Sequence, residues 1–507
     1  MPLPSRSGCE SATHHPLRNF LMTMRTRLAI TSLLLLLTAC SDNHDSFPPP
    51  ATPVTPVAPI SAATLASIDS YVQTQMSAQH IPGLSLMVTM DGKPVLQKGY
   101  GEANVTSHAA VTPDTVFRIG SVTKQFTATG IMLLVQEGKL TLDQPMSSLF
   151  PTAPVSWKGI TIRHLLNHTS GLQRDFPLEL LSQIQGNTTP PIDALVALGG
   201  QIPLDNAPGA AYSYSNLGYH LLGFVIEKIS GLSYATFLQQ RVFGVLGMTS
   251  ADVIATTKSV PNMAAGYTYD GTGIKPASTN YMIPGLIEAE GGLQMSAVDL
   301  AKWDASLLTE RFLTKASKEQ MWAPAKLNDG STVSYGFGWV LADVNNHPFT
   351  SHDGKLEGFT TEFDRHTGEG LSVIVLENQD DAVPGRIAAR ITAMIKPQLD
   401  WLIGTDPRPA TGALLRGLID ESMRGSLLID GRFAPEVREA LTPEVVAAYT
   451  GYFKPWSPLT QFGYIDTQTI HGIKVARYLV RSKVEDAVIG IAVDSDGRVT
   501  QLALLSE

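Results

Sequence analysis

The sequence predicts an α/β chain of the α+β kind, in which an antiparallel sheet is flanked by helices and accompanied by a largely helical lobe. Two β-hairpin patterns far apart in the chain carry this prediction. Residues 84–90 and 94–100 are strand-like and flank the turn dipeptide Asp91-Gly92. Residues 358–365 and 371–376 flank a second, glycine-containing turn. Because the pattern between the hairpins is mostly helical, we expect one sheet that is closed late in the chain.

Helical patterns fill the region between the two hairpins. Residues 122–136 form an apolar helix pattern that Gly138 ends, and residues 219–228 form another that ends before Gly231. A shorter helix is expected at 162–166. Residues 382–402 have amphipathic spacing, which predicts a long helix that covers the sheet.

The last hundred residues predict a separate, small α+β domain. Residues 405–409 contain two prolines and are interpreted as a linker. Beyond it, residues 410–507 show two helical patterns, at 413–423 and 443–452. Three strand patterns follow, at 475–482, 487–493 and 500–505. We interpret this part as an accessory domain.

Composition limits the class of partner. The chain has 507 residues, of which 43% are hydrophobic and 16% charged, and its formal net charge is -9. This composition is typical of a globular protein with more than one domain. No basic stripe with interleaved aromatic residues is present, so nucleic acid is not expected as a partner.

The N-terminus has the layout of an export signal. Arg25 and Arg27 precede an apolar run over 28–37, which is too short to span a bilayer. The run ends in Thr38-Ala39-Cys40, and residues 37–40 resemble a bacterial lipobox, in which the cysteine becomes lipidated. Residues before Met22 or Met24 are interpreted as an upstream extension. Six prolines within residues 41–60 then favour an extended tether.

The first candidate catalytic pair is Ser121 and Lys124. On a helix, positions i and i+3 share a face, so the amine can reach the hydroxyl. A serine hydroxyl needs a neighbouring base, and a desolvated lysine can supply one. This spacing also occurs by chance, and a capping serine beside a surface lysine is the alternative.

The second candidate element is Tyr214-Ser215-Asn216. A tyrosine beside a lysine ammonium can carry protons between nucleophile, leaving group and water. Asn216 offers an amide that can hold the lysine or a substrate carbonyl. A packed loop tyrosine with a capping asparagine is the alternative interpretation.

Two His-x-Gly triplets compete for the third element. His366 lies near the tight turn of the second hairpin, so we expect a structural or solvent-exposed role for it. His352 precedes a strand, and Gly354 would let a substrate approach the backbone closely. His352 could donate to a substrate carboxylate or carbonyl. The backbone N–H of Lys355 could form an oxyanion hole with that of Ser121.

Together, the three elements resemble the serine β-lactamase and D,D-peptidase superfamily, whose motifs are Ser-x-x-Lys, Tyr-x-Asn and a triplet of Lys, His or Trp with glycine. Other stretches are similar to the branch that holds class C β-lactamases, D-alanyl-D-alanine carboxypeptidases, D-aminopeptidases and family VIII carboxylesterases. These stretches are Ile81-Pro82-Gly83, residues 117–121 and 162–172, Leu246-Gly247-Met248, Gly291-Gly292-Leu293 and residues 335–339. The resemblance covers about residues 61–402.

The resemblance implies a β-lactamase/transpeptidase-like fold for residues 61–402. With it, the expected organisation is a lipoprotein signal peptide over 1–40, a tether over 41–60, the hydrolase domain over 61–402 and the accessory domain over 410–507. His164 and His168 have the i, i+4 spacing of zinc ligands, but no third ligand completes a metal site in the local sequence. The resemblance implies that the adjacent Thr169-Ser170-Gly171 segment shapes the wall beside the site, so a structural role is expected.

The expected function is a serine hydrolase that acts through an acyl-enzyme on ester or amide bonds, in D-amino-acid peptides or small esters. Histidine at position 352 departs from the lysine of efficient β-lactamases, so rapid antibiotic hydrolysis is not expected. The alternative is a lipoprotein that binds penicillin or peptidoglycan and is acylated without turnover. Neither a metal nor another cofactor is expected. The expected location is the bacterial cell envelope, with membrane contact only through a lipid on Cys40.

Overall fold

The computed structural model describes residues 60–176, 196, 199, 202–254, 260–278, 288–470 and 473–505. The expected signal peptide, Cys40 and the tether lie outside the described residues. The described residues fall into two compact units, which divide between Asp400 and Trp401.

A seven-stranded antiparallel sheet forms the centre of the first unit. Its order is β11-β12-β13-β14-β1-β2-β3. The two predicted hairpins meet in this sheet, because β1 pairs with β14 in a register that places Leu86 opposite Val375. The prediction of one sheet closed late in the chain is therefore confirmed. The strands are β1 (Gly83–Met90), β2 (Lys93–Asn104), β3 (Ala109–Ala110), β11 (Val340–Val344), β12 (His347–Leu356), β13 (Phe359–His366) and β14 (Leu371–Glu377).

The two faces of this sheet are both covered. One face packs on α2 (Ala62–Ala78) and α14 (Pro384–Ile395), with Leu86, Val375 and Ile387 fully buried between them. The other face contributes Met87 and Ile374 to the main core, which it shares with α12 (Ala297–Leu307) and the helical lobe. Period-two alternation in β1 and β14 explains why each strand supplies both cores.

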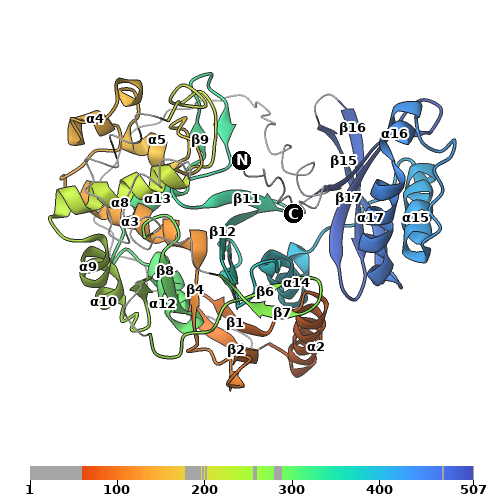
Figure 1. Cartoon of the computed structure of the whole chain (residues 1–507), viewed down its shortest axis with the longest axis horizontal. Coiled ribbons are helices and arrows are strands. Elements are labelled where there is room, and N and C mark those ends of the chain that lie inside the picture. Colours follow the sequence, from red (N-terminus) through yellow and green to blue (C-terminus); the bar gives the residue numbers. More distant parts are fainter. Residues whose placement is uncertain are drawn as a thin grey trace, which may run out of the picture. The chain divides into compact units, whose positions relative to one another are not determined.

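The helical lobe is built around α3 (Thr123–Gln136), whose residues 123–134 are all buried. It lies beside α8 (Asn216–Ser230), as Figure 1 shows. Gly130 permits this approach, since a Cβ there would lie 2.8 Å from Ile226 Cδ1. The lobe also contains α4 (Met146–Leu149), α5 (Ile162–Leu166), α9 (Tyr234–Leu238), α10 (Gly244–Leu246) and α13 (Lys315–Met321).

Short strands complete the first unit. The sheet β4-β8-β5 joins β4 (Val116–Arg118), β8 (Leu293–Ser296) and β5 (Asp252–Val253). The remaining pairs are β6 (Tyr267–Tyr269) with β7 (Ile274–Pro276), and β9 (Ala325–Lys326) with β10 (Thr332–Val333). Within the described residues no single helix is long and apolar enough to cross a membrane, although α8 and the helical segment after it pass that test as a bent pair.

In the residues that the structure describes, the second unit contains a four-stranded antiparallel sheet and three α-helices. The sheet order is β15-β16-β17-β18, and Leu418 of α15, Val480 of β16 and Ile489 of β17 are buried together. The elements are α15 (Pro409–Arg424), α16 (Pro435–Ala440), α17 (Pro443–Phe453), β15 (Gln461–Ile470), β16 (Ile473–Arg481), β17 (Asp486–Val493) and β18 (Val499–Leu505).

One helix prediction needs correction, and two elements were not predicted. The helix expected over 382–402 is shorter, because Pro384 starts α14 and Pro397 prevents it from continuing past Ile395. The strand β15 was not predicted, because its segment carries polar residues without an apolar alternation. The helix α2 was not predicted either.

Candidate active site

Ser121 lies in the turn that connects β4 to α3. Gly120 has φ 50° and begins a 3-10 turn over Gly120–Val122, after which α3 starts at Thr123. A Cβ at Gly120 would lie 2.5 Å from the backbone nitrogen of Lys355, so only glycine fits there. A Cβ at Gly354 would likewise collide with the carbonyl of Ile119 and lie 3.2 Å from Ser121 N. The strand β12 therefore packs directly against the turn that carries Ser121.

Lys124 is fully buried and makes three hydrogen bonds. Its Nζ donates to Ser121 Oγ at 3.0 Å, to Asn216 Oδ1 at 2.9 Å and to the carbonyl of Glu290 at 2.7 Å. Burial lowers the pKa of Lys124 to about 8, and the nearby Glu290 carboxylate opposes part of that shift. Lys124 therefore loses its proton at a lower pH than an exposed lysine does.

Tyr214 lies beside both the same serine and Lys124. Its ring centroid is 4.9 Å from Lys124 Nζ, and its hydroxyl is hydrogen-bonded to Ser121. Burial raises the pKa of Tyr214 well above its usual value, against the smaller opposing effect of that hydrogen bond. The phenol is consequently neutral at neutral pH and can donate a proton.

Asn216 is placed by the start of α8. Ser215 caps this helix by accepting from Gly218 N at 3.0 Å, which directs Asn216 into the first turn. The side-chain oxygen of Asn216 accepts from Lys124, and its Nδ2 donates to Asp175 Oδ1 at 2.8 Å. The structure therefore brings Ser121, Lys124, Tyr214 and Asn216 together.

His352 does not present the free donor that the sequence predicted. Its ring is 2% exposed, and Nδ1 donates to the carbonyl of Asp353 at 2.6 Å. Because burial lowers the pKa of His352 to about 4, the ring is neutral, and Nε2 accepts from the Tyr335 hydroxyl at 2.9 Å. Both nitrogens are engaged within the protein. In this arrangement His352 supports Tyr335 and has no N–H for a substrate.

Lys355 has its backbone beside Gly120, as described above, while its side chain forms an exposed ion pair with Asp381 at 3.2 Å. The two parts of the residue therefore face different surroundings. The backbone nitrogen is the part of Lys355 that lies beside the serine turn, and its role as an oxyanion donor stays a prediction.

His366 is buried rather than exposed. It ends β13 with 3% exposure, and its ring packs on Phe349 at 4.7 Å between centroids. Burial lowers its pKa to about 4. The solvent-exposed alternative for His366 is wrong, and the structural alternative describes it.

Two residues of the site were not predicted. Glu290 contributes its carbonyl to Lys124 and holds a carboxylate oxygen 3.7 Å from Nζ; burial raises the pKa of this carboxyl. Tyr335 orients His352. The adjacent Gly291-Gly292-Leu293 stretch was noted in the sequence, but nothing local marked the glutamate before it.

His164 and His168 do not share a helix face. The helix α5 ends at Leu166, and His168 has a left-handed backbone with φ 59°. The Nδ1 atom of His164 accepts from Thr161 N at the start of that helix. Among the described residues no three potential ligand side chains converge on one point.

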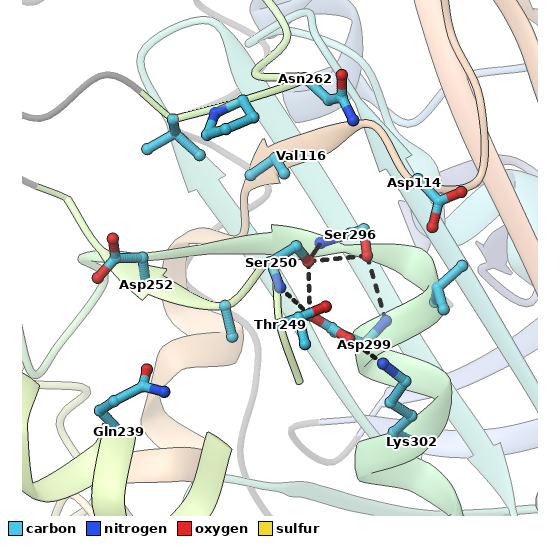
Figure 2. Close-up of a pocket in the computed structure, with 14 residues that line it drawn as sticks. Asp114, Val116, Gln239, Thr249, Ser250, Asp252, Asn262, Ser296, Asp299 and Lys302 are labelled. Carbon is cyan, nitrogen blue, oxygen red and sulfur yellow. Dashed lines mark hydrogen bonds and ion pairs between the residues drawn. The ribbon is translucent and has the colours of Figure 1, made fainter. Parts of the chain in front are cut away.

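A cavity of about 620 Å³, lined by described residues that do not include Ser121, lies elsewhere in the first unit. Figure 2 shows its centre, where Ser250 is held between Ser296 and the Asp299 carboxylate, with Oγ distances of 2.9 and 2.6 Å. The other oxygen of Asp299 accepts from Lys302 at 2.8 Å. These bonds tie the first turn of α12 to its neighbours. The Ser250 hydroxyl is engaged by the N-cap residue Ser296 and by Asp299 in the first turn of α12, so we assign this network to the start of that helix.

Comparisons with known proteins agree with this geometry. The family model described as Beta-lactamase matches residues 68–394. Penicillin-binding protein 4* of Bacillus subtilis (strain 168) is 32% identical over 314 residues, which are 59% of this chain and 68% of that protein. A D-aminopeptidase of Gluconobacter oxydans (strain 621H) is 29% identical over 306 residues, covering 59% of this chain and 56% of that protein.

Among solved structures, the D-amino acid amidase of Ochrobactrum anthropi SV3, complexed with L-phenylalanine amide, is similar with a TM-score of 0.57 and 26% identity. The match covers 67% of this chain and all of that one. The family model covers more than half of the chain and includes Ser121, Lys124, Tyr214 and Asn216. This chain therefore belongs to the Beta-lactamase family, within the serine β-lactamase and transpeptidase superfamily.

Proposed function

We propose that this protein is a serine hydrolase that cleaves amide bonds of D-amino-acid peptides or amides, and small esters, through an acyl-enzyme. The observation that carries the proposal is the hydrogen bond of 3.0 Å between a fully buried lysine amine and the Ser121 hydroxyl. A buried amine with a lowered pKa is the base that an alcohol nucleophile needs. The similarity to a D-aminopeptidase and a D-amino acid amidase supports the substrate class.

In the acylation step, the neutral amine of Lys124 accepts the proton of Ser121 Oγ, and Oγ attacks the substrate carbonyl carbon. The negative charge moves to the carbonyl oxygen, which the N–H groups of Ser121 and Lys355 stabilise. The close packing of Gly120 against the backbone of Lys355 supports this pairing of donors. The tetrahedral intermediate then expels the amine or alcohol.

The leaving group takes the proton of the Tyr214 hydroxyl, and the Lys124 ammonium restores it. The raised pKa of Tyr214 and the lowered pKa of Lys124 support these roles, in which the phenol starts protonated and the lysine is the terminal base. In deacylation the same pair removes a proton from water, the hydroxide attacks the ester, and Ser121 Oγ leaves with a proton. Microscopic reversibility requires this reuse.

Export and lipid attachment at Cys40 are also proposed. They rest on the basic residues, the short apolar run and the lipobox-like 37–40 segment, together with the proline-rich stretch that follows. Such an anchor would hold the hydrolase in the cell envelope, where peptides with D-amino acids occur.

The test is hydrolysis of a substrate panel by residues 61–507 and by its Ser121→Ala variant. The panel contains short-chain nitrophenyl esters, a D-alanyl anilide, a D-Ala-D-Ala peptide and a chromogenic cephalosporin. We expect turnover of the D-alanyl anilide and the esters, lost in the variant. Acylation of Ser121 in a 1:1 ratio without release on every compound would favour the binding protein that is acylated without turnover. Equal rates in both proteins would exclude Ser121 as the nucleophile.

A further inference from the structure

His168 lies directly behind the site and is not used by the mechanism above. It is completely buried and follows the end of α5. Its φ of 59° is a conformation that costs energy for most residues with a side chain, and histidine is among those that adopt it more often. A buried polar residue with this strained backbone motivates a search for its function.

His168 accepts hydrogen bonds from the two residues that flank Tyr214 in the sequence. The carbonyl of His168 accepts from Ser213 N at 2.9 Å. Its Nδ1 accepts from Ser215 N at 3.1 Å. These donors are the residues immediately before and after Tyr214, so one residue fixes the backbone on either side of the phenol.

The ring of His168 also fixes the phenol itself. Its centroid is 4.2 Å from that of Tyr214 at an interplanar angle of 33°, the shortest of its aromatic contacts. The rings of Tyr335, Tyr219 and Tyr212 surround it at 4.7, 5.1 and 6.0 Å. The ring of Tyr214 therefore packs against a cluster of aromatic side chains around His168.

Only the neutral ring can make this arrangement, because Nδ1 must be unprotonated to accept from Ser215 N. Burial is the main effect that lowers the pKa of His168 well below its usual value. The cations of Lys124 and Arg174 and the ring of His352 add to it. The bonding pattern is therefore maintained at neutral pH.

We infer that His168 is a positioning residue for Tyr214: its carbonyl and Nδ1 hold the backbone on both sides of the tyrosine while its ring orients the phenol toward Ser121. This inference rests on the proposed function, because it assigns His168 to the proton transfer that Tyr214 performs. His168 is not a catalytic residue, since no contact with Ser121 is observed and its acceptor nitrogen is already occupied.

The test compares two substitutions of the same branching. Asn places its side-chain oxygen the same number of bonds from Cα as Nδ1, and it tolerates a positive φ. Leu places a methyl group there. We expect His168→Leu to lower kcat about 100-fold with KM changed less than about 3-fold, and His168→Asn, which keeps the acceptor but lacks the ring, to lower kcat only about 10-fold. If His168→Leu does not fold, His168→Gln replaces it in the comparison with His168→Asn. The side-chain oxygen of Gln lies one bond further from Cα than that of Asn, so it is displaced from the position of Nδ1.

A double-mutant cycle with Tyr214→Phe separates positioning from general destabilisation. If His168 acts through the phenol, His168→Leu should cost less than about 3-fold further in the Tyr214→Phe background. The matched control is His366→Leu, which replaces an equally buried histidine on β13 and should leave kcat unchanged at temperatures where the variant is folded.

Two results would overturn the inference in an active wild type. One is an equal loss of kcat for His168→Asn and His168→Leu. The other is a His168→Leu effect that persists in full without the Tyr214 hydroxyl. Failure of the proposed function has a different signature, because wild-type activity would then be absent or would survive Ser121→Ala.

Discussion

The Nζ atom of Lys124 lies 3.0 Å from the Oγ atom of Ser121, at a position where the lysine side chain is fully inaccessible to water. The lysine also donates to Asn216 and to the Glu290 carbonyl. Its amine is therefore held in place by two fixed acceptors from distant parts of the chain.

Replacement of this amine tests its role as the base. We expect Lys124→Ala to lower the acylation rate by about 10²- to 10⁴-fold, the range that general base catalysis contributes. The rate is measured by stopped-flow with a nitrophenyl ester under single-turnover conditions. Lys302→Ala is the control, because Lys302 lines the cavity around Ser250 and forms an ion pair with Asp299. An acylation rate near that of the wild type would remove Lys124 from the mechanism.

The pH dependence follows from the lowered pKa of Lys124, which is about 8. The neutral amine is the active form, so its fraction rises tenfold per pH unit below that value and levels off above it. We expect kcat/KM to increase with pH and to reach a plateau above about 8. A profile that is flat between pH 6 and 9, measured with one ester in constant ionic strength, would be inconsistent with lysine as the base.

Glu290 should shift this profile. Its carboxylate raises the pKa of Lys124 relative to burial alone, because the negative charge favours the ammonium. Glu290→Gln removes the charge and keeps the backbone carbonyl that Lys124 contacts. We expect the midpoint of the rising limb to move to lower pH. Glu310 likewise acts to raise the pKa of Lys318, so Glu310→Gln is a charge control outside the site, and its profile should match the wild type.

The packing of β12 on the serine turn predicts a steric effect at Gly120. Gly120 and Gly138 both have positive φ, of 50° and 67°, but only Gly120 has backbone atoms where a Cβ would be. Gly138→Ala should cost about 1 kcal/mol of stability, from backbone strain alone. Gly120→Ala should cost more and should slow labelling of Ser121 by a fluorophosphonate at least about tenfold, because the residue-355 backbone must move. Similar melting temperatures and similar labelling rates for the two variants would contradict the proposed fit.

Sequence reasoning predicted the parts of this site that local spacing encodes. The i, i+3 relation of Ser121 and Lys124 follows from helix geometry, and α3 begins one residue after the predicted start. The order of the three motifs then indicated Tyr214 and Asn216. The paired hairpins were predicted because strand alternation and turn glycines are local signals.

Other parts depended on contacts that no local pattern encodes. Glu290 meets Lys124 across 166 positions of sequence, and Tyr335 meets His352 through a bond between a loop tyrosine and a strand. The predicted donor role of His352 differs from the structure because Tyr335 and the Asp353 carbonyl occupy both ring nitrogens. The sequence predicted only a structural role for His168. Its local pattern did not indicate the contacts with Ser213, Tyr214 and Ser215.

The most direct test of the central claim is intact-protein mass spectrometry of residues 61–507, acid-quenched within milliseconds of mixing with a D-alanyl ester, followed by peptide mapping. The account predicts a transient mass increase equal to one acyl group, located on Ser121, absent in Ser121→Ala and strongly slowed in Lys124→Ala. Turnover without any acyl adduct, or an adduct on a residue other than Ser121, would contradict it.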